Sequence, residues 1–449
     1  MYVDFLLEVW AANQNAEAII WKEQTYAYGW LLERFRYWQK KIGAEKIEPG
    51  EVVVLEADFS PNAVTLFLAL SDHGCILVPL TDSVRAHRDE YISTAQAEVH
   101  ISIDGKDEVS ISRLPGRAAH PLYRRLRTER HPGLVLFSSG STGESKAAVH
   151  DLLWLLKKFK VSRHSYRTIT FLLYDHIGGV NTMLYTLANA GCIVTVQERT
   201  PDEVLRAIEK YRVELLPTSP TFINLILLSE AYRRHDLSSL KTITYGTEPM
   251  SETTLRRAHE LFPEVSLLQT YGLSEVGILR SKSRGSDSLW VKIGGEGYET
   301  RVVNGILQIK AKSAMLGYLN APSPFTDDGW LNTGDAVEVD GEYLRILGRK
   351  SELINVGGEK VYPTEIESVI LELETVREAT VYGEKNPITG QIVCANVTPS
   401  IELADSAKRE FIAEVKRHCR ERLQGYKVPV KINVVSDRQY TDRFKKVRR

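Results

Sequence analysis

The sequence of 449 residues has few cysteines and no excess of charge of either sign. Its four cysteines include no Cys-x-x-Cys pair, which argues against a zinc site or a disulfide framework. We expect all four to be small buried hydrophobic side chains in a protein of a reducing compartment. They are Cys75, Cys192, Cys394 and Cys419. The formal net charge of −1 leaves no global positive field for nucleic acid or an acidic membrane surface.

Long apolar runs are also missing. The most apolar stretch, 63–80, is interrupted by Ser71-Asp72-His73-Gly74, which argues against a membrane span. The N-terminal segment lacks a basic region and carries Asp4 and Glu8, so we expect no signal peptide. We therefore expect a cytoplasmic protein. The basic run 443–449 is a local exception in charge and, taken alone, is typical of a solvated tail.

Strand and helix patterns alternate over the first 300 residues. This alternation predicts an α/β fold of parallel sheets covered by helices, with ligands at the carboxyl ends of the strands. Strands are expected at 51–55, 75–78, 134–137, 168–174, 192–196, 213–216, 241–245 and 267–270. Helices are expected at 62–71, 180–190, 201–211 and 251–261.

The pattern changes after about residue 300. Asn304-Gly305 and Asp340-Gly341 separate strand patterns and predict two hairpins. A compact α+β pattern follows Gly348-Arg349, with helices near 363 and at 405–424 and strands at 376–382, 391–398 and 428–435. We expect a large domain at 1–348, a hinge at 349–351 and a small domain at 352–449.

The most informative motif is the loop 137–147, which follows an apolar run. Glycines let the backbone wrap around a ligand, and successive N–H groups form an anion-binding concavity. The spacing is not that of a P-loop, since Gly140 and Gly143 are too close together. A solvated surface turn is the alternative for this loop alone. The residues expected to hold a polyphosphate are Ser138, Ser139, Gly140, Ser141, Thr142, Gly143 and Lys146.

Further segments carry residues suited to a nucleotide. Tyr271 can stack on a flat base, Ser274 can reach a phosphate, and Glu275 can ligate Mg²⁺ through a hard oxygen. Asp335 follows a tight turn and can accept two hydrogen bonds from a ribose diol. Each segment alone is commonly an ordinary turn or a solvated charge run, but their order along one chain argues against coincidence.

Together the motifs resemble the adenylate-forming superfamily, which includes acyl- and aryl-CoA synthetases, firefly luciferase and the adenylation domains of nonribosomal peptide synthetases. The resemblance extends from residue 51 to the C-terminal tail. It implies a large N-terminal domain of helix-covered sheets with a distorted β-barrel portion, and a small mobile α+β C-terminal domain. The matching motifs are 138–147, Tyr-Gly-x-Ser-Glu at 271–275, Thr-Gly-Asp at 333–335 and Gly-Arg at 348–349.

The resemblance implies a two-step reaction. A carboxylate attacks the α-phosphate of ATP to give an acyl adenylate and pyrophosphate, and a thiol then displaces AMP. Thr142 and its loop correspond to the site for the β- and γ-phosphates, Glu275 to the Mg²⁺ ligand, and Asp335 to the ribose contact. Arg349 corresponds to a contact with a ribose or phosphate oxygen. Adenine is expected between Tyr271 and the segment 245–248, with further contacts from Gly246, Thr247, Glu248, Thr270, Gly272 and Ser274.

The tail supplies the lysine that bridges carboxylate and α-phosphate in similar proteins, in the pattern Thr-x-x-Gly-Lys-x-x-Arg. With Thr441 in register the lysine is Lys445 and the arginine Arg448. A slip of one residue gives Lys446, but we favour Lys445 because the threonine then aligns. Phe444 replaces the glycine, which leaves the conformation of this loop open.

The resemblance also implies that the small domain rotates between the two half-reactions. Gly357 and Gly358 then line a pantetheine tunnel, where bare backbone leaves room for a narrow chain. Ser351 occupies the usual pivot position, and Ser145 replaces the usual proline of the phosphate loop.

The acid pocket is expected to involve the segment 174–179. His176-Ile-Gly-Gly resembles the corresponding segment of aryl- and acyl-CoA ligases, whereas Asp175 keeps an amino acid open as substrate. His176 could instead be a packing residue that never touches the acid. The pocket residues that we expect are Asp175, His176, Gly178, Thr218, Phe222, Tyr245 and Gly277.

We therefore expect an ATP- and Mg²⁺-dependent, AMP-forming acid–thiol ligase that uses a small carboxylic acid and coenzyme A, without nucleic acid. One alternative is a stand-alone adenylation enzyme that loads an acyl or aminoacyl group onto the phosphopantetheine of a carrier protein. A second is a family member that binds nucleotide without catalysis, suggested by Ser145, Ser351 and Phe444. Retention of Glu275, Asp335 and Lys445 argues against that second alternative.

Overall fold

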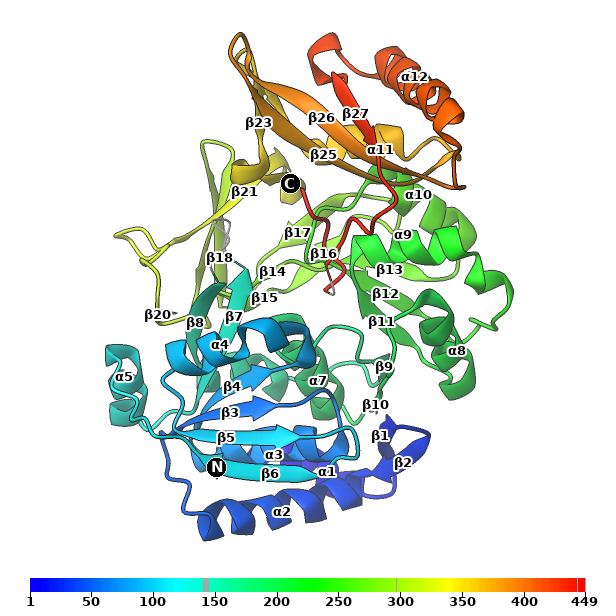
Figure 1. The fold of residues 1–449 in the computed structure, drawn as a ribbon. Coiled ribbons are helices and arrows are strands. Elements are labelled where there is room, and N and C mark those ends of the chain that lie inside the picture. Colours follow the sequence, from blue (N-terminus) through cyan, green and yellow to red (C-terminus); the bar gives the residue numbers. More distant parts are fainter. Residues whose placement is uncertain (140–144, 296, 442, 449) are drawn as a thin grey trace.

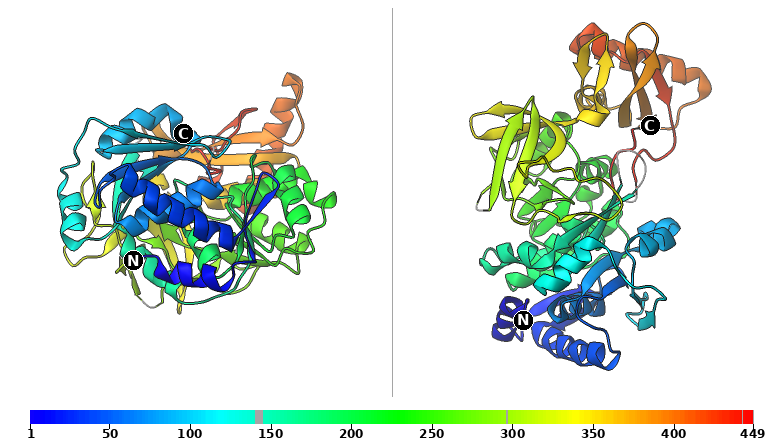
Figure 2. Two further views of the ribbon diagram at one scale, coloured as in Figure 1. Left: turned by 90° about the horizontal axis from the view of Figure 1, so that it is seen from below. Right: turned by 90° about the vertical axis from the view of Figure 1, so that its left-hand side faces the viewer.

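The computed structural model describes residues 1–139, 145–295, 297–441 and 443–448. A large domain occupies most of the molecule, and a small domain lies at one end of it (Figures 1 and 2). The C-terminal tail leaves the small domain and runs back into the large one (Figure 1). Among the described residues, none of the helices is both long enough and apolar enough to cross a lipid bilayer.

The first sheet of the large domain is seven-stranded, in the order β20-β8-β7-β4-β3-β5-β6. The central pairs β3–β4, β3–β5 and β4–β7 are parallel, and the pairs β5–β6, β7–β8 and β8–β20 are antiparallel. The strands are β3 (Val52–Glu56), β4 (Ile76–Leu80), β5 (Val99–Ile103), β6 (Val109–Arg113), β7 (Gly133–Ser139), β8 (Ser145–Asp151) and β20 (Gly317–Tyr318).

The second sheet is also seven-stranded, in the order β13-β12-β11-β9-β10-β1-β2. Only the edge pair β1–β2 is antiparallel among the pairs that the structure describes. The strands are β1 (Glu17–Trp21), β2 (Gln24–Ala27), β9 (Arg167–Ile169), β10 (Cys192–Val194), β11 (Leu215–Thr218), β12 (Thr242–Tyr245) and β13 (Ser266–Gln269).

Helices cover both sheets, and several begin with the local signals that favour a helix start. Ser219 and Ser251 accept hydrogen bonds from the backbone N–H groups of the first turn, and Pro220 stands at the first position of its helix. The helices of the large domain are α1 (Asp4–Ala12), α2 (Tyr28–Ala44), α3 (Pro61–His73), α4 (Arg88–Thr94), α5 (Pro121–Glu129), α6 (Leu152–Leu156), α7 (Ile177–Ala188), α8 (Pro201–Tyr211), α9 (Pro220–Ser229) and α10 (Glu252–Leu261).

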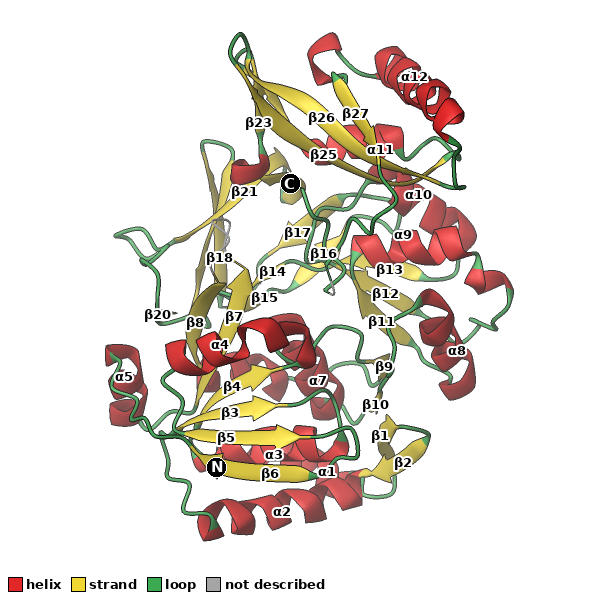
Figure 3. Ribbon diagram, viewed as in Figure 1, coloured by secondary structure: helices red, strands yellow, loops and turns green. Residues whose placement is uncertain are grey.

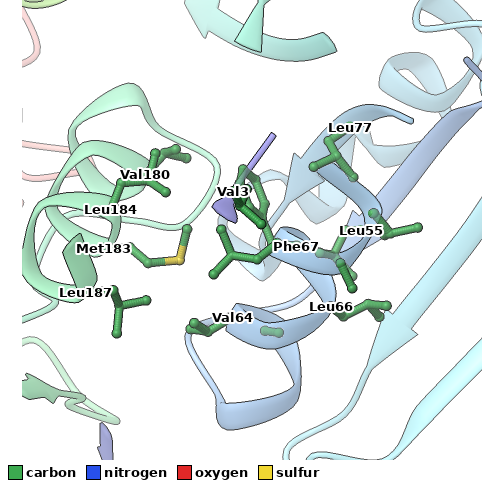
Figure 4. Packing of buried hydrophobic residues seen from close by; sticks show 14 of the residues in the cluster. Val3, Leu55, Val64, Leu66, Phe67, Leu77, Val180, Met183, Leu184 and Leu187 are labelled. Atoms are coloured by element: carbon green, nitrogen blue, oxygen red, sulfur yellow. The ribbon is translucent and has the colours of Figure 1, made fainter. Parts of the chain in front are cut away.

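The hydrophobic core joins the two sheets through α3 and α7. Phe67 of α3 lies between Met183 of α7 and the side chains of the first sheet (Figure 4). All of these side chains are buried, and such burial stabilises a domain by about 25 cal/mol per Å² of apolar surface. The core therefore holds the loop before α7, which contains His176, in a fixed position.

The third sheet is antiparallel and curls into a half-barrel (Figure 3). Asn304 and Gly305 both have positive φ, 52° and 76°, as the predicted hairpin between β18 and β19 requires. The strands are β16 (Ser281–Ser283), β17 (Trp290–Ile293), β18 (Tyr298–Val303), β19 (Ile306–Ala311), β21 (Leu331–Asp340) and β22 (Tyr343–Arg349). A short pair, β14 (Gly272–Leu273) and β15 (Gly277–Ile278), lies outside this sheet.

The small domain has its own sheet and core. Two helices, α11 (Pro363–Ile370) and α12 (Asp405–Arg422), accompany the strands, and their buried side chains belong to the core of this domain. The strands are β23 (Ile354–Val356), β24 (Glu359–Val361), β25 (Val376–Asn386), β26 (Gly390–Pro399) and β27 (Lys431–Val434). The predicted fold class, α/β with a half-barrel portion and a small α+β domain, is confirmed.

The structure differs from the sequence predictions in the length of some elements and in the direction of some strand pairs. The strand expected at 168–174 ends at Ile169, since the following residues form the loop that leads to α7. The sheets expected to be parallel also carry antiparallel pairs, because a hairpin can extend a sheet at its edge.

Candidate active site

The candidate site lies where the carboxyl ends of β11, β12 and β13 meet the C-terminal tail. These strands are parallel and in register, so that Thr218, Tyr245 and Gln269 lie side by side. Gly246 follows directly, and a Cβ atom there would lie 2.6 Å from Thr270 Oγ1 and 2.7 Å from Thr270 O. Only glycine fits this position, and its small size allows the segments 245–248 and 270–275 to lie in contact.

Several buried polar atoms at this edge have no hydrogen-bond partner among the described residues. They are the hydroxyl oxygens of Thr218, Tyr245 and Thr247 and Oδ1 of Asp175. Buried polar atoms are normally bonded, because leaving one unpaired costs about 1–3 kcal/mol. Such a cluster at the ends of neighbouring strands is typical of a site that a polar ligand completes.

The strands that flank the predicted phosphate loop are connected to Glu275 through Tyr318. Ser138 pairs with Lys146 across β7 and β8, and Lys146 Nζ lies 5.6 Å from the ring centre of Tyr318. The Tyr318 hydroxyl donates a hydrogen bond of 2.5 Å to Glu275 Oε1. Tyr318 therefore connects the loop to the predicted Mg²⁺ ligand. The predicted residues Gly140, Ser141, Thr142 and Gly143 lie outside the described residues, as does the side chain of Ser139.

Glu275 has an oxygen to offer a metal ion. Its Oε1 accepts from Tyr318, whereas the described residues give Oε2 no hydrogen-bond donor. A carboxylate oxygen of this kind is the ligand that Mg²⁺ prefers. The neighbouring Ser274 bonds the ring of the buried His150 through its backbone carbonyl, which fixes the turn that carries Glu275.

Asp335 is buried and lies between an aromatic and a cationic side chain. The Tyr271 hydroxyl donates to Asp335 Oδ2 at 2.5 Å, and Arg349 Nε lies 3.4 Å from Oδ1. Burial raises the pKa of the Asp335 carboxyl, although Arg349 and the Tyr271 hydroxyl partly offset this effect. A carboxylate has about four acceptor positions, so Asp335 retains capacity for a ribose diol.

Lys445 is partly buried at the centre of the site. Burial and the nearby cations Arg443 and Arg349 lower the pKa of its ammonium group to about 8. His176 lies beside it and is also partly buried, and burial together with Lys445 and Arg443 lowers the pKa of its imidazole well below the usual value. A small cavity is lined by His176, Thr247, Arg443 and Lys445, among others. A carboxylate bound there would contact the lysine.

The turn that carries Lys445 is anchored by its neighbours. Phe444 has φ 51°, a left-handed conformation that a glycine adopts without strain. Its ring lies 5.1 Å from the ring centres of Phe171 and Phe222 and is largely buried. Arg443 forms an ion pair of 2.9 Å with Asp175. The tail is therefore docked on the large domain rather than solvated.

Lys446 points away from this centre. Its ammonium donates to Glu367 Oε2 and to the carbonyl of Ala379, both in the small domain. Arg448 bonds the same Glu367 through two nitrogen atoms. Burial alone would raise the pKa of Glu367, but the two cations outweigh it and lower the pKa to about 2. Lys446 thus has a structural contact, whereas Lys445 faces the site.

Two predicted residues are not part of this assembly. Gly357 and Gly358 form the turn between β23 and β24, with φ values of 62° and 97°. The N–H of Gly357 donates to Thr389, in the turn between β25 and β26, at the end of the small domain away from the large one (Figure 1). In this orientation of the domains they lie far from Lys445.

The acid pocket residues lie around the start of α7 and the strand ends. His176 caps α7 by accepting the N–H of Gly178 through Nδ1. Phe222 is fully buried against Phe171 and Phe444, so its side chain supports the predicted acid pocket from within the core and is not exposed on a surface. Gly277 has φ 82° and leads into β15.

Sequence reasoning missed Tyr318 and Arg443. Arg443 belongs to the basic C-terminal run, but its partner Asp175 is 268 residues away. Tyr318 sits on a two-residue strand that no periodicity reveals.

A sequence profile described as "AMP-binding enzyme" matches residues 7–304 of the chain. The chain belongs to this family. A second profile, "AMP-binding enzyme C-terminal domain", matches residues 365–445 and so includes Lys445.

Proteins similar to this chain in sequence are named as CoA ligases or CoA synthases. Indoleacetate–CoA ligase of Aromatoleum aromaticum is 30% identical over 296 residues, which cover 60% of this chain and 57% of that protein. A long-chain-fatty-acid–CoA ligase of Haemophilus influenzae is 29% identical, over 70% of this chain and 60% of that protein. Feruloyl-CoA synthase of Amycolatopsis is 26% identical, over 96% of this chain and 93% of that protein. The chain therefore spans about three fifths of the first two relatives and most of the third.

Solved structures share the fold at low sequence identity. The anthranilate CoA ligase AuaEII, in complex with anthranoyl-AMP, has a TM-score of 0.83 at 20% identity and covers 97% of this chain and 93% of that one. The amide bond synthetase McbA of Marinactinospora thermotolerans has a TM-score of 0.77 at 22% identity, and the match covers 99% of this chain and 97% of that one. Both likenesses extend through the two domains.

Proposed function

We propose that this protein activates a carboxylic acid with ATP and transfers the acyl group to the thiol of coenzyme A. The observation that carries the proposal is the position of Lys445, which lines one cavity with His176 and Thr247 at a strand edge where several buried polar atoms have no partner among the described residues. The family membership and the CoA ligase names of relatives support it.

In the first step a carboxylate oxygen forms a bond to the α-phosphorus of ATP. The bond from that phosphorus to the bridging oxygen of the β-phosphate breaks, and pyrophosphate leaves. Lys445 contributes by placing a positive charge between carboxylate and α-phosphate, where negative charge develops. With a pKa of about 8, its ammonium is largely protonated at neutral pH.

The remaining residues position the nucleotide. Asp335 accepts the ribose hydroxyls, and Arg349 beside it contacts a ribose or phosphate oxygen. Thr142 and the phosphate loop hold the β- and γ-phosphates. Glu275 would hold Mg²⁺, and a bound ion would neutralise phosphate charge.

In the second step the thiol sulfur attacks the acyl carbonyl carbon, its proton is released, and AMP leaves. This step needs the loop at Gly357 and Gly358 near the adenylate, so we propose that the small domain turns about 349–351. Residues 350–352 form only a short 3-10 helix, which can absorb the change in dihedral angles.

The test is an acid panel with two thiol acceptors. Purified protein, ATP and Mg²⁺ are incubated with aryl, aliphatic and amino acids, and pyrophosphate release is measured. Productive acids are then offered coenzyme A or a phosphopantetheinylated carrier protein. We expect release with a subset of the acids and a thioester with coenzyme A. A thioester formed only with the carrier protein would overturn the choice of acceptor, and absence of pyrophosphate release with every acid would overturn the proposal.

A cytoplasmic location belongs to the same proposal. It is supported by the four cysteines, all of which are buried and free rather than joined in disulfides.

A further inference from the structure

Glu248 connects two other segments of the chain beside the cavity at Lys445. Its Oε1 accepts a hydrogen bond of 2.8 Å from the backbone N–H of Thr221 and a second one from the Thr221 hydroxyl. Its Oε2 accepts a hydrogen bond of 3.1 Å from the backbone N–H of Lys446. The two oxygens of one carboxylate therefore hold the start of α9 and the tail residue next to Lys445.

The contact of Glu248 with the tail is made by backbone atoms of the tail. The N–H groups of Phe444 and Lys445 bond within the tail itself, to Thr441. The next N–H, that of Lys446, bonds Glu248 in the large domain. Glu248 therefore holds the backbone of the turn that carries Lys445, and a substitution of the Lys446 side chain leaves this bond in place.

The residue before Glu248 has an unfavourable backbone conformation. Thr247 has φ 75°, in the left-handed region that a β-branched residue rarely adopts. Its hydroxyl oxygen is buried without a partner among the described residues, and Thr247 lines the same cavity as His176 and Lys445. Such a conformation persists only where surrounding contacts enforce it, and it is common at functional sites. The two bonds from Thr221 to Glu248 directly follow Thr247 in the chain and can enforce it.

A simpler role for Glu248 is that of an acceptor at the start of α9. A carboxylate is favourable there, because the first N–H groups of a helix lack partners within the helix. This role uses Oε1 and Thr221, but it does not account for the bond from Lys446 to Oε2. In addition, Ser219 already caps the first turn of α9. The second oxygen of Glu248 therefore points to a role in docking the tail.

We infer that Glu248 is a positioning residue for the first half-reaction, and that it fixes the turn at Lys445 relative to the cavity wall at Thr247. The inference rests on the proposed function and deepens it, since it assigns Glu248 to the docking of the tail rather than to a contact with adenine. Under the proposed rotation of the small domain, the bond to Lys446 opens before the second step. Glu248 should therefore affect the first step and not the second.

The charge of Glu248 also acts on Lys445. Burial and the cations Arg443 and Arg349 lower the pKa of the Lys445 ammonium, whereas the carboxylates of Glu248 and Glu275 act in the opposite direction. Removal of the Glu248 charge should therefore lower this pKa further. The shift is a measurement that a general loss of structure would not produce.

The test compares Glu248→Ala and Glu248→Gln with the wild type in both half-reactions. Exchange of labelled pyrophosphate with the productive acid measures the first, and transfer from the supplied acyl adenylate to coenzyme A measures the second. We expect kcat for exchange to fall by about 10- to 100-fold in Glu248→Ala, as for a misplaced reacting group, with KM for ATP within about threefold. Glu248→Gln keeps one acceptor oxygen and should lie in between. Transfer from the adenylate should stay within about threefold of the wild type in both variants.

The pH profile and a control variant separate positioning from a general effect on the fold. In Glu248→Gln, the decline of kcat/KM for pyrophosphate release should begin at lower pH than in the wild type, because the ammonium loses a nearby anion. Glu252→Gln is the matched control, since the Glu252 side chain is 65% exposed and pairs with Arg345 away from the cavity. It should keep the wild-type kinetics and pH profile.

A milder variant replaces Glu248→Ala if that protein fails to fold in thermal unfolding. Thr221→Val removes the hydroxyl that donates to Glu248 and keeps the backbone N–H. It should lower kcat for exchange by roughly 2- to 10-fold, as for one hydrogen bond, again without an effect on transfer from the adenylate.

The outcomes separate the inference from the proposed function. Exchange at the wild-type rate in Glu248→Ala, or in Thr221→Val where it replaces that variant, would overturn the inference. A rise in KM for ATP as the main effect, an equal loss in both half-reactions or an unshifted pH profile in Glu248→Gln would overturn it as well. Absence of exchange in the wild type with every acid of the panel would instead overturn the proposed function.

Discussion

At the scale of single residues, the site depends on one lysine and on how its neighbours present it. Phe444 stands where the family pattern has glycine, yet it keeps the left-handed conformation, which costs a residue with a side chain roughly 1–2 kcal/mol. Its buried contacts with Phe171 and Phe222 offset this cost. Phe444 therefore lacks the conformational freedom of a glycine, but its ring makes buried apolar contacts next to Lys445.

The pH dependence of the first step tests the environment of Lys445. Only the ammonium form can stabilise the developing charge, and its pKa is lowered to about 8. We therefore predict that kcat/KM for ATP-dependent pyrophosphate release falls as pH rises through about 8. Lys445→Arg keeps a charge at all accessible pH values, so its residual activity should lack this decline. A wild-type profile that is flat up to pH 10 would contradict the assignment.

At the scale of elements, the C-terminal tail is fixed by one buried carboxylate. Glu367 on α11 accepts from both Lys446 and Arg448, and its pKa is lowered to about 2. A lowered carboxyl pKa stabilises the fold at neutral pH. That contribution is complete above the unfolded value of about 4.3 and is lost as pH falls towards about 2.

Glu367→Gln should be strongly destabilising. It leaves Lys446 without a carboxylate partner and Arg448 with Glu352 alone, and breaking such a buried pair costs about 3–5 kcal/mol. Urea unfolding of the intact chain measures the change in the free energy of unfolding. Glu365→Gln is the control, because the Glu365–Lys427 pair is more exposed and should contribute less than about 1 kcal/mol. Equal stabilities of the two variants would contradict this account.

Local sequence patterns predicted elements well and long-range contacts poorly. The helix at 201–211 and the Asn304-Gly305 hairpin were predicted because proline, capping and turn residues act locally. The strand at 168–174 was predicted too long, since apolar residues also line the loop before α7. The docking of Arg443 on Asp175 could not be predicted, because it depends on how the two domains pack.

At the scale of the whole molecule, the orientation of the domains decides which loop can reach the site. Lys445 lies in the site, whereas Gly357 and Gly358 lie at the far end of the small domain. Thr253 of α10 and Ser368 of α11 help hold this orientation, with their hydroxyl oxygens 3.2 Å apart. Under the proposed mechanism, this orientation fits the first step and has to change for the second.

A disulfide between these positions should separate the two steps. We predict that oxidised Thr253→Cys/Ser368→Cys retains acid-dependent pyrophosphate exchange but forms thioester at least ~10-fold more slowly, since a domain motion gates the second step. Reduction should restore the rate. The Thr253→Cys single variant, treated with the same oxidant, controls for oxidation elsewhere. Thioester formation at the wild-type rate in the locked protein would contradict the proposed rotation.

The most direct test of the central claim is exchange of labelled pyrophosphate into ATP, with the productive acid, in Lys445→Ala and Lys446→Ala. Removal of the charge that stabilises the transition state should lower exchange by about 100-fold or more in Lys445→Ala. Lys446→Ala should retain most of the exchange, because Lys446 contacts only Glu367 and Ala379 through its ammonium. Exchange at the wild-type rate in Lys445→Ala would contradict the account.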